Sequence, residues 1–442
     1  MKIIVNLEND KSRSDFYLNY MRDVFPERVN DIILIAILPT DEFNKWASEQ
    51  TDITYIYFEE PTTAGSAFNQ VIEGLALEDD VLIMDDCHIP LANSFDYLEK
   101  GLITADKAFA VGPVSNSFNY LQRVEWADAE EAMEWSGRQQ ESEPEETLGL
   151  HNGVIFFSRA VIDGRNTFDD KAGNVFDMVI EKCIRGFLDH GRMYICRNSA
   201  FWDVRGSDYR DNQIADIDLL EKNFGIHYLN LGGNALIIDD VLNLFDADEE
   251  VKILEIGCDC GGTLFRIKKT IKNAELYGTD INENALKFAA EFATVKAGNI
   301  ENKDLDFGVN NFDVIIFGDV LEHLRDPLGV LIFCKKLLKT GGRIVASIPN
   351  LMNIEVMRLL LNGDFTYAEY GLLDKTHIHM FTFNEIKRMF VDDAGYTIEK
   401  MSMNGELSPE NDRLADELLK LGKAEKFMYQ AYQFQVVARF DG

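Results

Sequence analysis

Short apolar runs rich in β-branched residues alternate with segments of helical periodicity along this chain of 442 residues. In its first half the strand-like runs fall at 2–7, 31–38, 53–58, 81–84, 108–111 and 154–157, with helical patterns between several of them, at 66–77 and 91–102. This alternation predicts an α/β fold in which helices cover a mostly parallel sheet. The chain is too long for one hydrophobic core, so we expect two domains, each with a core of its own.

A polar stretch, RGSDYRDN at 205–212, marks the predicted end of the first domain. We therefore expect one domain over 1–212 and a second over 235–442. The linker between them would cover 213–234 and contain a helical bridge near 213–224. The two halves share the α/β rhythm but not their motifs, so the second is not a repeat of the first.

The most informative pattern lies in 251–323, where the strand-like run VKILEIG leads into CDCGGTL. Asp280 and Asp319 each follow a further apolar run, at the point where a parallel strand would end. Open α/β sheets bind ligands at that edge. Asp280 follows Glu255 by 25 residues, close to the spacing of about 20 expected for an acid that binds a ribose. A glycine-rich turn followed by such an acid suits a ribose-bearing cofactor.

The net charge of −33 changes the picture of possible partners. A nucleic-acid binder carries a basic patch that neutralises phosphates, and the sequence shows none, so we expect no nucleic acid as partner. A polyanionic acceptor would be repelled, which favours a small or neutral one. The densest acidic run, 125–149, is typical of a solvated insertion.

Three further features bear on the compartment. No apolar stretch reaches the roughly 18 residues that a membrane-spanning helix needs, so no transmembrane segment is expected. The first residues enter a strand-like run directly, unlike a signal peptide. The six cysteines are scattered in apolar runs without a metal-type or disulfide-type array. Together these features predict a cytoplasmic protein.

The motifs of the second half resemble those of class I S-adenosylmethionine (SAM) dependent methyltransferases, over roughly 225–442. LLKTGGRIVASIPN resembles the fifth strand of that family, and YQFQVVARF its final antiparallel strand. The segment GDFTYAEYGLLDKTHIHMFTFNEIKRMFVDDAGY is similar to one found in methyltransferases of bacterial surface-glycan pathways. The resemblance implies a Rossmann-like domain with a mostly parallel seven-stranded sheet, and SAM as its cofactor.

The resemblance also implies which residues bind this cofactor. They are Glu255, Gly257, Asp259, Gly261, Asp280, Asn299, Ile300 and Asp319. Asp280 would accept hydrogen bonds from both ribose hydroxyls, although an aspartate here also suits a helix N-cap. Asn299 would contact the adenine and Asp319 the methionyl part. Asp259 stands where the family has a glycine, and its carboxylate suits the ammonium of SAM but repels its carboxylate.

Two histidines are candidates for the proton transfer that methylation of a hydroxyl requires. His377 lies in LLDKTHI and His323 in DVLEHL. A neutral imidazole in reach of a hydroxyl is a suitable base, and we favour His377 over His323. For both, a hydrogen bond that stabilises the fold is the alternative. Tyr367, Tyr370 and Phe381 suit stacking against a sugar, with core packing as the alternative.

The first half resembles GT-A glycosyltransferases of the large family-2-like group, over about 1–210. AGSAFNQVIEGLALEDDVLIMDDCHIP is similar to their nucleotide-sugar site. The resemblance assigns the nucleotide-sugar to Asn69, Asp85 and Asp86, and a divalent metal, Mn²⁺ or Mg²⁺, to Asp86 and His88. The chain departs from the family because its Asp-x-Asp lacks the second acid, and because no acidic doublet supplies a general base.

These observations predict a bifunctional glycosyltransferase and methyltransferase of glycan or sugar-conjugate biosynthesis. Its partners would be a small-molecule nucleotide-sugar and a saccharide or glycoconjugate acceptor. In the alternative, the first domain is a degenerate GT-A unit that only binds glycan or a partner beside an active methyltransferase. A nicotinamide dehydrogenase is disfavoured because the glycine turn lies mid-chain without the spacing of the third glycine.

Overall fold

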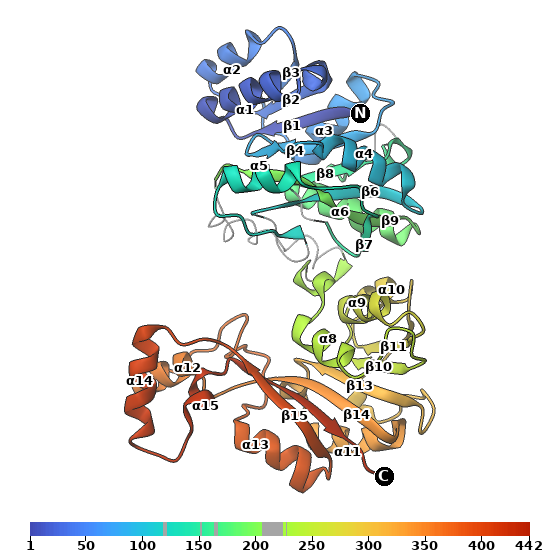
Figure 1. Cartoon of the computed structure of the whole chain (residues 1–442), viewed down its shortest axis with the longest axis vertical. Coiled ribbons are helices and arrows are strands. Elements are labelled where there is room, and N and C mark those ends of the chain that lie inside the picture. The colour runs from blue at the N-terminus through green and yellow to red at the C-terminus, as the bar shows by residue number, and fades with distance from the viewer. Residues whose placement is uncertain (118–121, 151–152, 163–166, 206–223, 227) are drawn as a thin grey trace. The chain divides into compact units, whose positions relative to one another are not determined.

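The computed structural model describes residues 1–117, 122–150, 153–162, 167–205, 224–226 and 228–442. The chain divides into two compact units, Met1–Tyr228 and Leu229–Gly442, coloured blue to green and green to red in Figure 1. The expected domain end at 212, the first half of the expected linker and all of the helical bridge but its last residue fall in 206–223, outside the described residues.

The first unit contains a nine-stranded mixed sheet. Its strands are β1 (Lys2–Leu7), β2 (Ile32–Ile37), β3 (Thr54–Phe58), β4 (Val81–Asp85), β5 (His88–Pro90), β6 (Ala108–Ser115), β7 (Glu145–Thr147), β8 (Val154–Phe157) and β9 (Arg192–Asp203). They lie in the order β3-β2-β1-β4-β8-β6-β9-β5, and β7 pairs with β9. The pairs among β1 to β4 are parallel, but β8 runs antiparallel to both of its neighbours, β4 and β6.

The expectation of a mostly parallel first sheet was therefore wrong, and β8 explains why. Its four residues, VIFF, are all fully buried. A strand that is buried on both faces shows no alternation, so its sequence does not record the direction in which it runs.

Helices cover the first sheet as the pattern predicted. They are α1 (Lys11–Val24), η1 (Pro26–Asp31), α2 (Asp41–Ser48), α3 (Ala64–Gly74), α4 (Ser94–Thr104), α5 (Ala129–Gly137), η3 (Arg159–Val161) and α6 (Val175–Leu188). The acidic run 125–149 contains α5 and β7, and the rings of Trp126 and Trp135 in it pack 5.3 Å apart. This run is thus folded, but most of its side chains are exposed, as expected for a solvated segment.

The second unit contains a seven-stranded sheet in the order β12-β11-β10-β13-β14-β16-β15. Its strands are β10 (Lys252–Ile256), β11 (Glu275–Asp280), β12 (Thr294–Ala297), β13 (Phe312–Gly318), β14 (Leu338–Pro349), β15 (Thr397–Asn404) and β16 (Gln433–Arg439). The first five strands of the order are parallel, and β16 runs antiparallel to both β14 and β15. The sheet is therefore mixed, with the expected antiparallel last strand.

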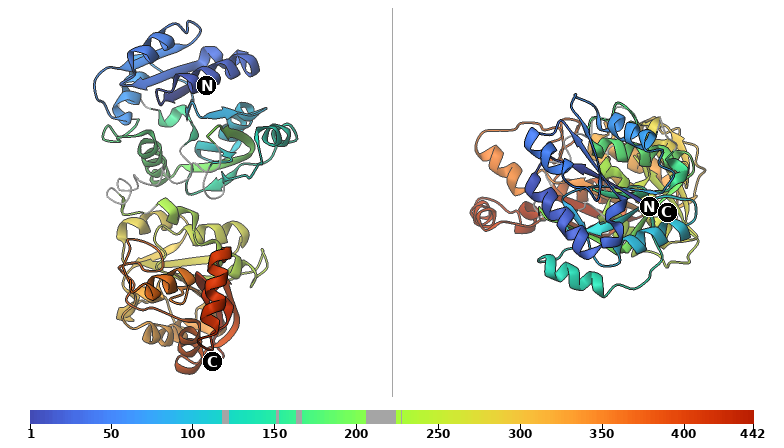
Figure 2. Two further views of the ribbon diagram at one scale, coloured as in Figure 1. Left: turned by 90° about the vertical axis from the view of Figure 1, so that its left-hand side faces the viewer. Right: turned by 90° about the horizontal axis from the view of Figure 1, so that it is seen from above.

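Most of the helical elements of the second unit lie on the two faces of this sheet, whereas those at 354–361, 409–419 and 426–430 pack on one another (Figures 1 and 2). The helical elements are η5 (Tyr228–Gly232), α8 (Ala235–Leu242), α9 (Gly262–Thr270), α10 (Glu283–Ala289), η6 (Ile300–Asn302), η7 (Leu321–His323), α11 (Pro327–Leu337), α12 (Ile354–Leu361), α13 (Phe383–Lys387), the π-helical turn η8 (Arg388–Asp393), α14 (Pro409–Leu419) and α15 (Lys426–Gln430). One apolar cluster joins the sheet to α8, α9 and α10, and another joins it to α11, α13 and η8.

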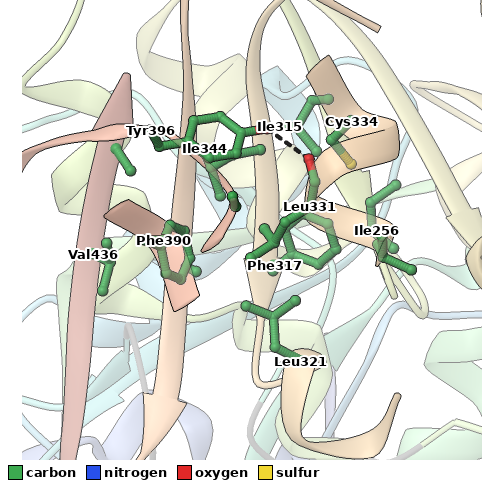
Figure 3. Packing of buried hydrophobic residues seen from close by; sticks show 14 of the residues in the cluster. Ile256, Ile315, Phe317, Leu321, Leu331, Cys334, Ile344, Phe390, Tyr396 and Val436 are labelled. Atoms are coloured by element: carbon green, nitrogen blue, oxygen red, sulfur yellow. Dashed lines mark hydrogen bonds between the residues drawn. The ribbon is translucent and has the colours of Figure 1, made fainter. Parts of the chain in front are cut away.

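Figure 3 shows the second of these clusters, in which Phe317 and Ile344 of the sheet pack against Leu331 of α11 and Phe390 of η8. The Tyr396 hydroxyl in this view is satisfied, because it donates to the Leu331 carbonyl at 2.8 Å. A dense, satisfied core of this kind holds the strand ends rigidly.

The strand order reverses at β10. The chain proceeds from β10 to β11 and β12 on one side of it, and then to β13 and β14 on the other. At such a reversal the loops after adjacent strands diverge and leave a crevice at the carboxyl ends. None of the helices in the described residues is both long and apolar enough to cross a membrane.

Candidate active site

A cavity of about 610 Å³ lies at the carboxyl ends of β10, β11 and β13, in this crevice. Of the eight residues predicted to bind a cofactor, only Gly261 is absent from its lining. The acidic landmarks read from the sequence therefore meet in one place, as parallel strands require.

The turn after β10 contains three residues with left-handed backbone: Gly257 at φ +72°, Asp259 at +45° and Gly261 at +81°. A Cβ on Gly261 would lie 2.8 Å from the Phe292 ring and 2.9 Å from the Cβ of Ala289. Glycine is required there by both conformation and space. Asp259 adopts the left-handed backbone at a cost of about 1 kcal/mol, which shows why the family pattern has a glycine at this position.

The side chain of Asp259 is held in place. Its Oδ2 accepts a hydrogen bond from Asn230 Nδ2 at 2.7 Å. Burial raises the pKa of Asp259, the Asn230 bond opposes this, and the nearby Asp280 raises it further. The carboxylate is thus part of a shared acidic lining and not a loose side chain that could turn away from a ligand.

Asp280, at the end of β11, joins two loops. Its Oδ2 accepts from the Asp259 amide and its Oδ1 from the Asn282 amide, both at 2.8 Å. The N-cap of α10 is Asn282 and not Asp280, so the structural alternative considered for Asp280 does not hold. Each carboxylate oxygen has a second lone pair, and these remain able to accept ribose hydroxyls.

Glu255, at the end of β10, is 4% exposed, and its Oε2 has no hydrogen-bond partner among the described residues. Burial raises its pKa to about 8; a hydrogen bond from Thr263 opposes the shift, and Asp259 and Asp280 add to it. A buried polar atom without a partner is costly. An ammonium group of a ligand would satisfy this oxygen and favour the charged carboxylate.

Asp319, after β13, is held by three distant segments. Its Oδ1 accepts from Ser347 Oγ at 2.9 Å and Gln433 Nε2 at 2.7 Å, and its Oδ2 accepts from Asn234 Nδ2 at 3.2 Å. Its backbone has φ +55°. The hydrogen bonds that Asn230, Asn234, Ser347 and Gln433 make to the acids of the cavity could not be predicted, because each is a single polar residue without a motif around it.

The part of the cavity next to β12 has fewer available polar groups. Asn299 lines it, but its Oδ1 accepts from the Glu301 amide at 2.9 Å and caps η6. Ile300 is buried and contributes an apolar wall. Asn299 thus shapes the loop after β12, and the apolar contact comes from its neighbour.

The lining has a consistent charge. Glu255, Asp259, Asp280 and Asp319 all line the cavity, whereas no lysine or arginine does so among the described residues. A cationic ligand such as SAM, with a sulfonium and an ammonium against one carboxylate, suits this lining. A dinucleotide would bring a pyrophosphate into it, which counts against the dehydrogenase alternative.

The two predicted histidines come together although 54 residues separate them. Their ring centroids are 4.8 Å apart, and the rings meet edge to face. His323 lines the cavity, and His377, which is not among the lining residues, contacts His323. Burial, and the adjacent His323, lower the pKa of His377, so this imidazole is neutral at pH 7.

In the first unit, Asn69 does not face an open site. It is buried; its Nδ2 donates to the Phe168 carbonyl and to Asp170 Oδ1, both at 2.9 Å, and its Oδ1 accepts from the Phe168 amide at 3.0 Å. The side chain of Asn69 therefore links α3 to the segment 168–170, and its nucleotide-sugar role stays a prediction.

Asp86 and His88, the pair expected to hold a metal, point to different partners. Asp86 is fully buried and accepts from Arg13 Nε at 3.0 Å and from Ser14 Oγ. Burial raises its pKa to about 6, against the opposing effects of Ser14 and Arg13. His88 is also fully buried, with Nδ1 2.7 Å from Asp85 Oδ1. The two ligands of the expected site are thus engaged separately.

Asp85 is the remaining nucleotide-sugar candidate. Burial by itself would raise its pKa, but His88 and Arg205 outweigh burial and bring it to about 2. The groups of the first unit whose ligand atoms lie within reach of one another, among the described residues, are Glu8, Asp85 and Cys87. Asp85 is therefore ionised beside two groups that the sequence analysis did not consider.

Comparison with known proteins adds independent support for the second unit. Residues 254–344 match a protein family described as "Methyltransferase domain". A ubiquinone biosynthesis O-methyltransferase of Cereibacter sphaeroides is 31% identical over 174 residues, which make up 34% of this chain and 70% of that enzyme. Its namesake in Idiomarina loihiensis is 29% identical over 161 residues, 35% of this chain and 64% of that enzyme.

Coverage of these relatives is partial in other cases. In a second strain of C. sphaeroides the match is 30% identical over 137 residues and spans 55% of the relative. A crystal structure of a SAM-dependent methyltransferase from Archaeoglobus fulgidus overlaps with 50% of this chain and 98% of its own at 20% identity, with a TM-score of 0.35. Nothing below rests on that overlap.

The family match covers the strands that build the cavity, and a relative at 31% identity shares 70% of its length with this chain. The cavity itself has the glycine turn, an acid at the end of β11 and a lining of carboxylates, which suit a cationic nucleoside. The chain is therefore a class I SAM-dependent methyltransferase, and SAM is its cofactor.

Proposed function

We propose that the second unit transfers a methyl group from SAM to a hydroxyl of a saccharide or glycoconjugate. When bound, SAM supplies a methyl group on a cationic sulfur, which is the difficult chemistry of the reaction. The residues of the chain have to hold SAM, orient the acceptor and remove one proton.

Four carboxylates would hold SAM. Asp280 is placed for the ribose hydroxyls, and Glu255 and Asp259 for the ammonium, since Glu255 Oε2 has no other partner among the described residues. Asp319 is fixed from three sides and keeps a rigid negative charge at the mouth of β13. A rigid lining of this sign favours the sulfonium form of the cofactor over its neutral product.

The observation that carries O-methylation is the pair of histidines beside this cavity. His377 is neutral at pH 7 and lies against His323, which lines the cavity. Neutral imidazoles can act on a hydroxyl proton, whereas they add little when the acceptor is an already nucleophilic amine. The relatives named above are O-methyltransferases, which supports the same choice.

The saccharide acceptor is supported by aromatic side chains in the segment that precedes His377. Tyr367 is 51% exposed and Tyr370 is 68% exposed. Exposed aromatic rings of this kind are suited to stack on the apolar face of a sugar. Phe381, by contrast, is buried in the core cluster and is not available for stacking.

For the first unit we propose a GT-A-like fold that binds a saccharide without transferring a sugar. The parallel order β3-β2-β1-β4 with acids at the end of β4 supports the fold. The internal engagement of Asn69, Asp86 and His88 favours binding without turnover over the bifunctional alternative.

The test combines binding and turnover. Calorimetry should detect S-adenosylhomocysteine but not NAD, and ¹⁴C-methyl SAM should label a hydroxyl-bearing saccharide. Incubation with UDP-, GDP- or dTDP-sugars and Mn²⁺ or Mg²⁺ should release no sugar. Labelling of amines but not of hydroxyls would overturn O-methylation, and sugar release would restore the bifunctional reading.

A further inference from the structure

Three potential ligand groups converge beside the cofactor cavity. Glu322 and His323 lie on η7, and His377 lies on the segment that follows Asp374. One ligand atom from each lies within 4.8 Å of the others. The segment is attached to η7 directly, since the Glu322 carbonyl accepts from the amides of Ile378 and His379 at 2.9 and 3.0 Å.

The carboxylate of Glu322 has nothing to satisfy it. Its side chain is 1% exposed, and among the described residues neither of its oxygens has a hydrogen-bond partner. The nearest basic atom is His377 Nε2, 4.0 Å from Glu322 Oε1, which is too far for a hydrogen bond. Buried carboxylates without partners are rare because their desolvation is not repaid. A positive group between these atoms would repay it.

The hydrogen bonds of the two histidines engage Nδ1 of each ring and leave Nε2 able to bind a cation. His377 Nδ1 lies 3.2 Å from the Leu372 carbonyl, which can only accept, so Nδ1 carries the proton and Nε2 a lone pair. His323 Nδ1 lies 3.1 Å from Thr376 Oγ1. That hydroxyl donates to Asp374 Oδ1 at 2.6 Å and so accepts from the histidine. Both rings therefore have the tautomer, and the supporting hydrogen bond, that metal-ligating histidines have.

We propose that Glu322, His323 and His377 bind a divalent first-row transition-metal cation such as Mn²⁺, Fe²⁺ or Zn²⁺. Two imidazoles and one carboxylate are a donor set for these ions, which leaves further coordination positions open. Ligand atoms around a six-coordinate ion lie about 3 to 4 Å apart, given metal–ligand distances of about 2.1 Å. The 4.0 Å between His377 Nε2 and Glu322 Oε1 lies at the upper end of this range, and a separation of 4.8 Å would have to shorten by about 1 Å when the cation binds.

The open positions of this site face the cofactor cavity, because His323 lines that cavity. A hydroxyl oxygen of the acceptor is a suitable further ligand, and a cation makes such a hydroxyl more acidic. This consequence rests on the proposed function, whereas cation binding does not. In this arrangement the imidazoles act on the hydroxyl proton through the cation, which makes the hydroxyl acidic enough for its proton to pass to water as the oxygen takes the methyl group.

The experiment uses the full chain, freed of metal by a chelator and gel filtration. Titration with Mn²⁺, followed by the electron paramagnetic resonance signal of the free ion, should reveal binding that Glu322→Gln and His377→Gln each weaken at least tenfold. The matched control is His379→Gln, since His379 lies two residues away but bonds to the Arg325 carbonyl, outside the three-residue site. It should bind Mn²⁺ as the wild type does.

S-adenosylhomocysteine binding serves as the folding readout in every variant, and it should persist. If Mn²⁺ binds equally to the wild type and to Glu322→Gln, the inference is overturned. Binding at Glu8, Asp85 and Cys87 would give this result. So does an absence of binding by both Mn²⁺ and Zn²⁺. If methyl transfer to a hydroxyl continues in the chelated enzyme, the cation's role in the reaction fails, the binding site is decided by the titration alone, and the proposed function stands. If the cation binds and no hydroxyl is methylated, the cation site stands and the proposed O-methylation fails.

Discussion

The two units place carboxylates at the same position, the carboxyl edge of parallel strands, and treat them in opposite ways. At the end of β4, Asp86 is paired with Arg13, and Asp85 with His88. At the ends of β10, β11 and β13, the carboxylates line a cavity into which no lysine or arginine reaches among the described residues. The carboxylates of the first unit are paired with basic side chains of the protein, whereas those of the second unit are available to a cationic ligand.

The difference teaches that an acid at a strand end is not by itself a binding residue. A carboxylate satisfied from within stabilises the fold, because removing its partner leaves a buried charge. A buried carboxylate oxygen without a partner, such as Oε2 of Glu255, destabilises the folded state by its desolvation. A cationic ligand that pairs with it offsets this destabilisation. Four predictions test this contrast, in order of decreasing effect.

The largest effect is expected at the ribose-facing acid. Asp280→Ala should weaken S-adenosylhomocysteine binding at least 100-fold, because it removes the ribose acceptor and both loop contacts, to Asp259 and Asn282. Asp85→Ala in the first unit should leave this affinity unchanged. Isothermal titration calorimetry measures both, with circular dichroism to check folding. Equal losses in the two variants would contradict the contrast between the units.

The next effect concerns stability. Arg13→Leu should destabilise the first unit by about 3 kcal/mol, because Asp86 then stays buried without its partner. Urea unfolding followed by tryptophan fluorescence reports on this unit alone, since all four tryptophans lie in it (Trp46, Trp126, Trp135 and Trp202). The Asp86→Asn, Arg13→Leu double variant should recover part of the loss. A change below 0.5 kcal/mol in Arg13→Leu would show that Asp86 is not neutralised in this way.

The third effect is a pH dependence in the second unit. The folded pKa of Glu255, about 8, lies above its ordinary value, so the folded state holds its proton more tightly than the unfolded state. The stability from this group is complete below about pH 4.5 and is lost as the pH rises toward 8, by at most about 1.4 kcal/mol per pH unit. Hydrogen exchange of β10 peptides should show this trend in the wild type and a weaker one in Glu255→Gln.

The cofactor should reverse that trend. A cationic ligand favours the ionised form of Glu255, so the affinity for SAM should rise between pH 6.5 and about 8. Binding of SAM in this range should release the proton of the Glu255 carboxyl. Glu255→Gln should bind more weakly and show a flatter profile. Proton release measured by calorimetry in buffers of different ionisation enthalpy checks this. An affinity that falls with pH in the wild type would contradict it.

The smallest effect is expected at Asp259. Asp259→Gly relieves the left-handed backbone, worth about 1 kcal/mol, and removes the bond from Asn230. The two terms nearly cancel in stability, whereas the loss of one carboxylate should weaken SAM binding several-fold. Asn230→Ala should then have no effect in the Asp259→Gly background. Thermal unfolding and calorimetry on the four proteins of this cycle measure the coupling.

The sequence by itself determined much of the second unit. The apolar runs located its strands, Gly257 and Gly261 its glycine-rich turn, and the spacing from Glu255 to Asp280 a second acid that lines the same cavity. These features are local: a strand end, a turn and the residue after it are neighbours in sequence, so their chemistry can be recognised there. Even the two histidines could be proposed, although not the buried Glu322 between them.

Only the tertiary structure decided which acids are satisfied and which are open. Arg13 reaches Asp86 across 73 positions, and Gln433 reaches Asp319 across 114. It also decided the direction of β8, whose four buried residues have the same pattern in either direction. Periodicity records whether a side chain is buried. The identity of its partner depends on how distant segments fold together. That partner decides whether a buried charge is neutralised by the protein or is available to a ligand.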